Sequence, residues 1–284
     1  MGVTFFEFKF LELIKKDINF GKVLTIGRQE IILSNQEKKL FRINDSQLRD
    51  QKYIDKILLK KFNSLSVDSV DFSDFEKATI IADLNKPMEK KNFFNTIIDF
   101  GTSEHVFNIA QCLQNIADLC KKDGIILHSL PANNNCGHGF WQFSPELFFS
   151  LYTKENGFSD TEIFLFNSIN KYNLWKIKKQ PIGNRLELSS DIPLFLLVKT
   201  KKIKEITSQN VNQSDYQFLW DKNVITESKR KTKISKIWKK IKMNLKKFFL
   251  KKLLPKKLGE KIEGKNNLLK KNYLKSIYLD KIKI

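Results

Sequence analysis

Small or acidic residues follow four successive short apolar runs of the chain, at the point where each run ends. They are Gly27, Asp71, Asp83 and Asp99. A carboxylate has two acceptor oxygens and can accept hydrogen bonds from both hydroxyls of a ribose, while a glycine lets the backbone approach a ligand closely. The pattern predicts a site for a nucleoside-containing ligand. The alternative is that the acids are ordinary loop residues and helix caps.

The chain has three histidines, and each is a candidate general base. His105 stands near the start of a predicted helix, and His138 lies in a loop between two glycines. His128 falls inside an apolar run and is expected to be a core residue. We therefore predict that His105 and His138 are the catalytic residues.

The loop around His138 is rich in neutral hydrogen-bonding groups beside aromatic side chains, within the segment PANNNCGHGFWQFSPELF at 131–148. Amides pair with hydroxyl groups and aromatic faces cover C–H surfaces, which suits a sugar or another polyhydroxyl molecule. The expected substrate-binding residues are Asn133, Asn134, His138 and Trp141. Asparagines are also common in turns, because they tolerate the left-handed backbone conformation. Cys136 and His138 alone are too few ligands, so no metal site is predicted.

Short apolar runs alternate with stretches of helical spacing along most of the chain. Strands are expected at Lys22–Ile26, Leu65–Val70, Thr79–Ala82, Thr96–Ile98, Gly124–Leu130, Glu162–Asn167 and Pro193–Val198. Helices are expected at Val106–Cys120 and Pro145–Tyr152. Such alternation favours parallel strands with right-handed crossovers. Ligands of these sheets bind at the carboxyl ends of the strands, where the acids lie.

Several segments, taken in order, resemble the class I S-adenosylmethionine-dependent methyltransferases. NTIIDFGTSEHV at 95–106 is similar to that family's fourth-strand motif, and LCKKDGIIL at 119–127 is similar to the segment leading into its fifth strand. DFSDFEKATIIADLNKP at 71–87 and the loop 131–148 are similar to a bacterial subgroup, some of whose members are linked to surface polysaccharide genes. The resemblance spans residues 21–200. It implies a Rossmann-like α/β fold, with a mostly parallel sheet and helices on both faces.

The resemblance also implies S-adenosylmethionine as the cofactor and methyl transfer to a small polar or glycan acceptor, with a role in surface polysaccharide biosynthesis. The cofactor-binding residues that it implies are Gly27, Arg28, Asp71, Asp83, Leu84, Asp99 and Gly101. One motif departs from the family, because the strand KVLTI is followed by Gly27 alone and then Arg28. A non-catalytic scaffold on a degenerate methyltransferase fold is therefore the alternative. A dehydrogenase is not expected, since its G-x-G-x-x-G turn is absent.

Most of the net charge of +20 lies near the end of the chain. Residues 229–284 contain 21 Lys or Arg and three acids, whereas residues 1–228 contain 30 and 28. Within the basic part, 232–254 predicts a helix with an apolar stripe that includes Trp238 and Phe248. Such a helix suits an anionic membrane surface. The alternatives are packing on the domain and nucleic acid; the latter is not expected, because it leaves the stripe without a partner.

The expected organisation is a methyltransferase-like domain at 1–204, a linker at 205–228 and a basic amphipathic helical tail at 229–284. The three cysteines are an odd, sparse set, which fits a reducing compartment rather than a disulfide framework. Charged residues interrupt the N-terminal apolar stretch, unlike a signal peptide, and no run of about 18 apolar residues is present. We expect a cytoplasmic protein, peripheral at the inner face of the membrane. The oligomeric state is not predicted.

Overall fold

The computed structural model describes residues 2–43, 51–89, 91–167, 173–181, 190–205, 210–214 and 279–283, with 184, 186, 188, 216 and 217. The chain divides into two compact units. The first comprises Met1–Lys178, Ile192–Val211 and Asp280–Ile284, and the second comprises Lys179–Asp191 and Asn212–Leu279. The helices and strands below belong to the first unit, except that the last strand begins at Leu279.

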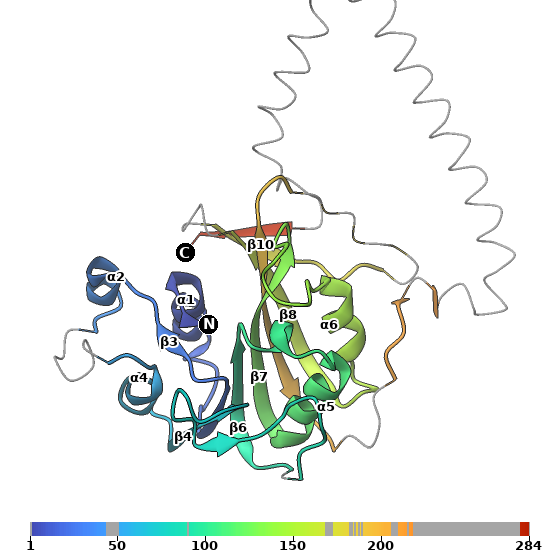
Figure 1. The fold of residues 1–284 in the computed structure, drawn as a ribbon. Coiled ribbons are helices and arrows are strands. Elements are labelled where there is room, and N and C mark those ends of the chain that lie inside the picture. Colours follow the sequence, from blue (N-terminus) through green and yellow to red (C-terminus); the bar gives the residue numbers. More distant parts are fainter. Residues whose placement is uncertain are drawn as a thin grey trace, which may run out of the picture. The chain divides into compact units, whose positions relative to one another are not determined.

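A nine-stranded sheet forms the centre of the first unit (Figure 1). In chain order its strands are β2 (Lys22–Ile26), β4 (Ser66–Asp71), β5 (Ile80–Ile81), β6 (Phe94–Phe100), β7 (Cys120–Asn133), β8 (Phe158–Phe166), β9 (Asn173–Ile177), β10 (Leu194–Lys202) and β11 (Leu279–Lys283). Their order across the sheet is β11-β9-β8-β10-β7-β6-β2-β4-β5. A separate parallel pair consists of β1 (Gly2–Val3) and β3 (Glu30–Ile31).

The half of the sheet from β7 to β5 is entirely parallel. The chain runs from β2 outward to β4 and β5, and then returns to the other side of β2 to form β6 and β7. This reversal makes a topological switch point between β2 and β6, which is where open α/β sheets bind their ligands. β10 runs antiparallel to both β7 and β8.

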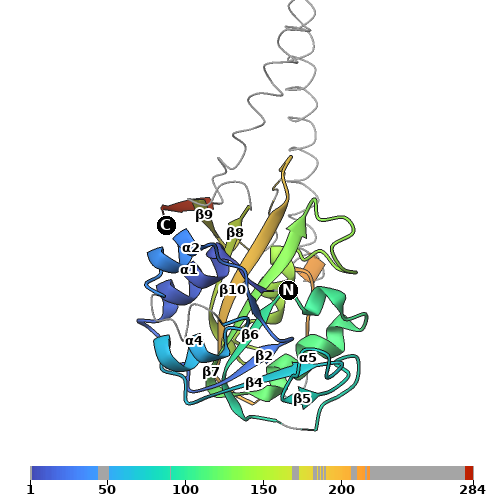
Figure 2. The ribbon, with the colours of Figure 1, turned by 60° about the vertical axis from the view of Figure 1, so that its left-hand side comes forward.

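Helices cover both faces of the sheet (Figures 1 and 2). On one face lie α1 (Phe5–Ile14), α2 (Asn35–Leu40) and α4 (Asp55–Lys61); on the other lie α5 (Ile109–Leu119) and α6 (Pro145–Leu151). Helices α1, α4, α5 and α6 bury apolar residues in this way, whereas the short polar helix α2 buries none. The Rossmann-like α/β fold predicted from the sequence is confirmed, with an antiparallel region at the β8–β10 side.

Helix α1 is an element that the sequence analysis did not predict. Thr4 and Glu7 form a capping box at its start, and the Glu7 carboxylate also accepts a 2.7 Å hydrogen bond from the Ser129 hydroxyl. Its aromatic side chains are buried in the core, where Phe6 stacks on Phe166 with ring centroids 4.4 Å apart. Apolar residues occupy seven of its ten positions and lie on all sides of the helix, so the segment shows no single apolar stripe.

The strand positions match the sequence predictions better than the strand ends do. β2 has the predicted bounds, but β7 runs on to Asn133, past Pro131, where the strand was expected to end. The pairing of β6 with β7 stops at Phe100 opposite Ser129. Pro131 therefore has no partner on the β6 side, and its missing N–H interrupts no parallel ladder.

The end of the chain contains a strand, β11, at the sheet edge beside β9. The sequence analysis predicted a helical tail, but an extended segment can pair with the free backbone groups of an edge strand. The predicted helix at 232–254 and most of the predicted linker lie outside the described residues, so the domain boundaries at 204 and 228 stay predictions. Among the described helices, none is both long and apolar enough to cross a membrane.

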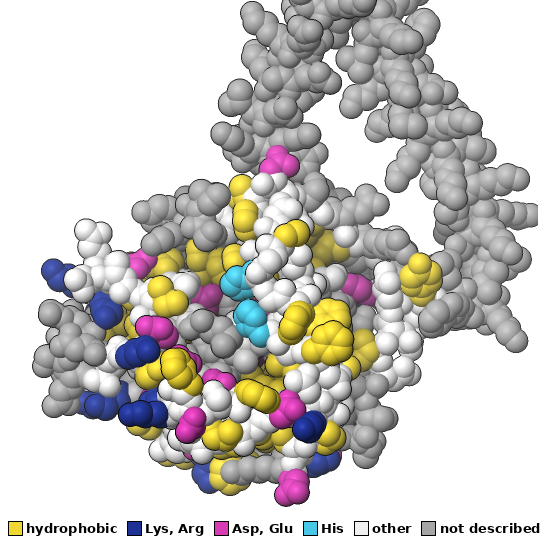
Figure 3. Space-filling model, viewed as in Figure 1, with side chains coloured by type: hydrophobic (Ala, Val, Ile, Leu, Met, Phe, Trp, Pro, Cys, Tyr) yellow, Lys and Arg dark blue, Asp and Glu magenta, His cyan; other side chains and the backbone are white. Residues whose placement is uncertain are grey.

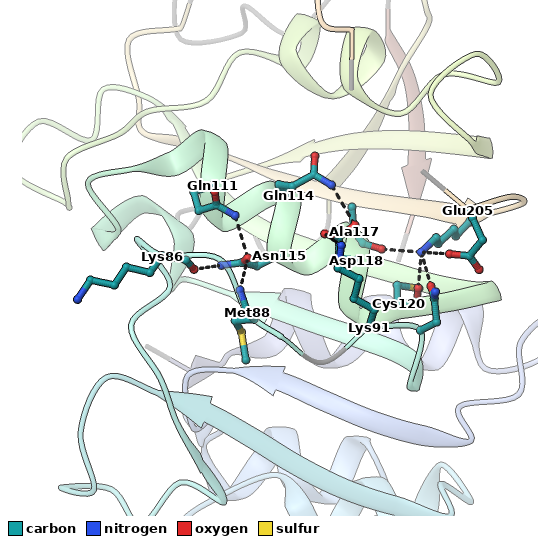
Figure 4. Close-up of polar contacts among 12 residues, drawn as sticks. Lys86, Met88, Lys91, Gln111, Gln114, Asn115, Ala117, Asp118, Cys120 and Glu205 are labelled. Carbon is teal, nitrogen blue, oxygen red and sulfur yellow. Dashed lines mark hydrogen bonds and ion pairs between the residues drawn. The ribbon is translucent and has the colours of Figure 1, made fainter. Parts of the chain in front are cut away.

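A buried lysine holds the C-terminal end of α5 (Figure 4). Lys202 is 1% exposed, and its ammonium group donates to the carbonyl oxygens of Ala117 at 2.9 Å and Cys120 at 2.7 Å. It also donates to Asn92 Oδ1 at 2.8 Å and lies 3.7 Å from the Glu205 carboxylate. A cation is favourable here because the last carbonyl groups of a helix lack partners within the helix.

We predict that Lys202→Met lowers the free energy of unfolding by about 1–3 kcal/mol, because it leaves buried carbonyl oxygens without a donor. Chemical denaturation of the full-length protein measures the change. The matched control is Lys201→Met on the same strand, whose side chain is 38% exposed and pairs with Asp123 at the surface. The control should cost less than about 0.5 kcal/mol. Equal costs in both variants would contradict the assigned role of Lys202.

Candidate functional site

The carboxyl ends of four parallel strands lie level with one another. Ile26 at the end of β2 is paired with Val70 of β4 and with Asp99 of β6. Asp71, the last residue of β4, is paired with Ile81, the last residue of β5. The residues that follow these pairs therefore come together at one edge of the sheet, on both sides of the switch point.

Two glycines form the turns on either side of the switch point. Gly27 follows β2 with φ +68°, and its N–H donates to the Val70 carbonyl at 2.7 Å. Gly101 follows β6 with φ +85°, and its N–H donates to the Ser129 carbonyl at 2.9 Å. Both turns use the left-handed region, which a residue with a Cβ adopts only with strain. The sequence placed both glycines at this edge, and the structure brings them there.

Arg28 joins the turn after β2 to the loop after β4. Its guanidinium group donates to the carbonyl oxygens of Glu76 at 2.7 Å and Lys77 at 3.1 Å. The same group lies 4.1 Å from the ring centroid of Tyr53, and its Nε is 3.8 Å from the Asp55 carboxylate. Arg28 thus braces the loop beside the predicted cofactor site rather than pointing freely into solvent.

The predicted residues at the end of β4 and after β5 differ in their surroundings. Asp71 is half-buried and its Oδ1 accepts from the backbone N–H of Phe72, whose own ring is 74% exposed. Asp83 accepts two hydrogen bonds from Asn85, which hold the pKa of Asp83 below its usual value. The side chain of Leu84 is buried in the core. Of these three residues, only the two aspartates have polar side chains that a ligand at the carboxyl edge of the sheet could contact.

Asn115 on α5 fixes the loop after β5 (Figure 4). Its amide nitrogen donates to the carbonyl oxygens of Leu84 at 3.2 Å and Lys86 at 2.8 Å. Its amide oxygen accepts from the Met88 N–H at 3.1 Å and from Gln111 at 3.0 Å. The sequence analysis missed this residue, because an asparagine within a helix gives no sign of which distant loop it binds.

Asp99 is completely buried at the end of β6. Its carboxylate accepts from the Ser103 N–H at 3.2 Å and from the Ser103 hydroxyl at 2.7 Å. The other contact is with His128 Nδ1 at 2.7 Å, while His128 Nε2 lies 2.6 Å from the Tyr152 hydroxyl. Burial raises the pKa of Tyr152 well above its usual value, so this hydroxyl keeps its proton within the network. Asp99, predicted to contact a cofactor, is thereby engaged in holding the start of the short helix η1 (Ser103–His105).

Glu104 lies in η1 with its side chain 1% exposed, and neither carboxylate oxygen has a hydrogen-bond partner among the described residues. His138 Nε2 is 3.5 Å from Glu104 Oε1, and His105 Nε2 is 4.0 Å from the same atom. The two imidazole rings have centroids 5.9 Å apart and are about half exposed. Figure 3 shows the two exposed histidines next to each other, with hydrophobic side chains around them. The structure thus brings both predicted catalytic histidines together.

The loop after β7 covers Glu104. Gly139 has φ +84°, and a Cβ at this position would lie 2.8 Å from the Glu104 carbonyl oxygen and 2.9 Å from its Cγ. The Phe140 N–H donates to the same carbonyl at 2.8 Å, and the Trp141 indole donates to the Val106 carbonyl at 3.0 Å. Only a glycine allows this close approach, which places the neighbouring histidine over the buried carboxylate.

The electrostatics of this cluster follow from its burial. Removal of the Glu104 carboxyl from water, with a contribution from nearby Asp99, raises the pKa of Glu104 to about 8. Burial, together with neighbouring His138, lowers the pKa of His105. At neutral pH the metal-free cluster therefore combines a protonated carboxyl group with a neutral imidazole.

The other predicted substrate-binding residues lie in the same covering loop. Asn133 ends β7, and its carbonyl accepts from the Asn135 side chain at 2.8 Å. Asn134 is exposed with φ +56°, as the turn interpretation of the asparagines expects. Trp141 is 37% exposed. Glu104, like Asn115, was not predicted from the sequence, because the loop that buries its carboxylate comes from more than 30 residues further along the chain.

No known family model and no curated protein matches the sequence. Among solved structures, the chain is similar to a SAM dependent methyltransferase from Archaeoglobus fulgidus, at 15% identity and TM-score 0.38, covering 69% of this chain and 98% of that chain. It is also similar to the N-methyltransferase NodS from Bradyrhizobium japonicum WM9, at 10% identity and TM-score 0.37, covering 69% and 93%. Similarity this distant does not bear on activity. The Rossmann-like assignment rests on the strand order and pairing above.

The raised pKa of Glu104 predicts a pH-dependent stability for the metal-free protein. Between the usual pKa of 4.5 and about 8, the unfolded state loses this proton and the folded state keeps it. The free energy of unfolding should therefore fall as the pH rises across this window, by on the order of 1 kcal/mol per pH unit. In Glu104→Gln this component is absent. The free energy of unfolding of the variant, relative to that of the wild type, should therefore increase from pH 5 to pH 8.

Chemical denaturation at four pH values between 5 and 8, with chelator present, tests this expectation. Glu89→Gln, which alters an exposed carboxyl group, is the matched control and should keep the wild-type pH dependence. The same slope in the wild type and in Glu104→Gln would show that the Glu104 carboxyl is not held protonated.

Proposed function

We propose that this protein is an S-adenosylmethionine-dependent methyltransferase acting on a small polar or glycan acceptor. The observation that carries the proposal is the meeting of Gly27, Asp71, Asp83 and Gly101 at the carboxyl edge of a parallel sheet, around a switch point. This is the place where such sheets bind nucleotide-like ligands. The sequence resemblance to class I methyltransferases supplies the identity of the ligand.

The residues at this edge fit the cofactor chemically. Asp71 carries a carboxylate next to the exposed ring of Phe72, a pairing that suits a ribose diol beside a flat base. The left-handed turn at Gly27 keeps the space in front of β2 free of a Cβ. Arg28 stabilises the loop after β4, in which Phe72 lies. Leu84 and Asp99 are buried, so we assign them supporting roles rather than direct contacts.

Methyl transfer demands alignment more than acid–base power. The bound cofactor supplies a sulfonium methyl group that is already activated, so the chain must hold the acceptor in line and exclude water. A hydroxyl acceptor must also lose a proton. His105 and His138 are half exposed and close to each other, and a neutral imidazole of either can accept that proton.

The surface around the two histidines suits an acceptor with both polar and C–H faces. Phe107 is 73% exposed and Phe140 68% exposed, and their rings meet edge to face at 6.0 Å. Trp141 and the asparagines at 133 and 134 lie in the same loop and add aromatic and amide groups. A sugar presents hydroxyls to amides and C–H faces to aromatic rings. A role in surface polysaccharide biosynthesis and attachment of the tail at 229–284 to an anionic membrane belong to this proposal.

Calorimetry of the full-length protein with S-adenosylmethionine and S-adenosylhomocysteine tests the proposal. We expect saturable binding of both, weakened about 10–100-fold in Asp71→Asn, because hydrogen bonds to a charged group contribute about 1.5–3 kcal/mol. The matched control is Asp123→Asn, an exposed aspartate in the amino-terminal part of β7, whose backbone at φ +65° asparagine tolerates.

Two results would contradict these expectations. Equal affinity in the wild type and in Asp71→Asn would remove Asp71 from the site. Absence of binding to the wild type at millimolar ligand would overturn the methyltransferase proposal and favour the non-catalytic scaffold.

A further inference from the structure

Glu104 is a buried carboxyl group that lies close to two imidazoles but accepts no hydrogen bond from the described residues. Its residue is 0% exposed, and both of its side-chain oxygens lack a hydrogen bond within the described part of the chain. Asp99, equally buried nearby, has its oxygens taken by Ser103 and His128. A buried carboxylate is ordinarily compensated by donors or by a cation. A cation beside Glu104 would provide this compensation by taking the place of the carboxyl proton.

Two imidazoles face that position. The ligand atoms of Glu104, His105 and His138 all lie within 4.8 Å of one another. A tetrahedral zinc site with bonds of about 2.0–2.2 Å separates its ligand atoms by roughly 3.3–3.6 Å. The distances from Glu104 Oε1 are 3.5 Å to His138, which falls within this range, and 4.0 Å to His105, which is slightly longer.

We propose that Glu104, His105 and His138 form a binding site for a divalent transition-metal ion of the zinc type. Two imidazoles and one carboxylate are a donor set that binds zinc or iron(II) and leaves coordination positions open. Because both histidines are about half exposed, solvent and small molecules can reach a metal ion held there. A polar atom of a small molecule can bind there.

This proposal departs from the expectation from the sequence that no metal is bound. That expectation considered only Cys136 and His138 as ligands. The tertiary structure instead groups His138 with His105 and Glu104, and Cys136 is not part of this group. With a metal bound, neither imidazole is free to act as a base, and the ion itself polarises a bound hydroxyl group. The inference does not require methyl transfer, since metal binding is measured directly.

The chain is well suited to a spectroscopic test. It contains only three histidines, and both ring nitrogens of buried His128 are already hydrogen-bonded. We would titrate metal-free, full-length protein with Co²⁺, following the visible absorption of the bound ion, and with Zn²⁺ by calorimetry. We expect one equivalent of either ion to bind, and Zn²⁺ to displace the cobalt spectrum.

His105→Asn and His138→Asn should each weaken binding by at least about 100-fold, since even the outer partners of metal ligands contribute 10–100-fold. Both side chains are half exposed, so these variants are expected to fold, which circular dichroism checks. Glu104→Gln should lose binding similarly; if it fails to fold, the histidine variants decide. The matched control is Cys136→Ser, an exposed residue of the same loop that should bind as the wild type does.

Failure of the wild type to bind either ion, or unchanged affinity in both histidine variants, would overturn the inference. A loss in Cys136→Ser as large as that in His138→Asn would overturn the assigned ligand set. None of these readouts depends on S-adenosylmethionine, so their failure is distinguishable from failure of the proposed methyltransferase function.

Discussion

The buried carboxylate of Asp99 fixes the chain that follows β6, beside the switch point of the parallel sheet. It holds both the amide and the hydroxyl group of Ser103 and also contacts His128. Through His128 the same chain of hydrogen bonds reaches Tyr152 at the end of α6. Because all of these groups are shielded from water, removing one leaves the next without a partner, which is costly in a low-dielectric interior.

This network determines what the neighbouring residues can do. Ser103 starts η1, so its fixed position sets the positions of Glu104 and His105, which follow directly. From the other side, the close packing of Gly139 on Glu104 brings His138 over the same carboxylate. Two segments more than 30 residues apart thus meet, and the buried acid is left facing two half-exposed imidazoles. The hydrogen-bonded network around Asp99 therefore supports a neighbouring group, Glu104, whose side-chain oxygens accept no hydrogen bond from the described residues. A well-supported polar group of this kind is typical of functional sites.

The sheet itself explains why candidate ligand-binding groups gather in one place. Parallel strands present their carboxyl ends on the same edge, and a reversal in strand order separates the loops after β2 and β6. Gly27 and Gly101 form those loops, while Asp71 and Asp83 follow the next two strands outward. Arg28 adds a feature that the strand pattern alone does not require, because it ties the first turn to the carbonyl groups of a neighbouring loop.

The sequence alone determined the fold class, the positions of most strands and the edge at which polar residues collect. These depend on local properties, namely apolar runs, helical periodicity and the residue that ends each run. Only the tertiary structure decided that Asp99 is buried and fully bonded, that α1 packs as an aromatic helix, and that Glu104 joins His105 and His138. Burial and the meeting of distant segments depend on how the whole chain packs, so a residue type and its immediate neighbours do not reveal them.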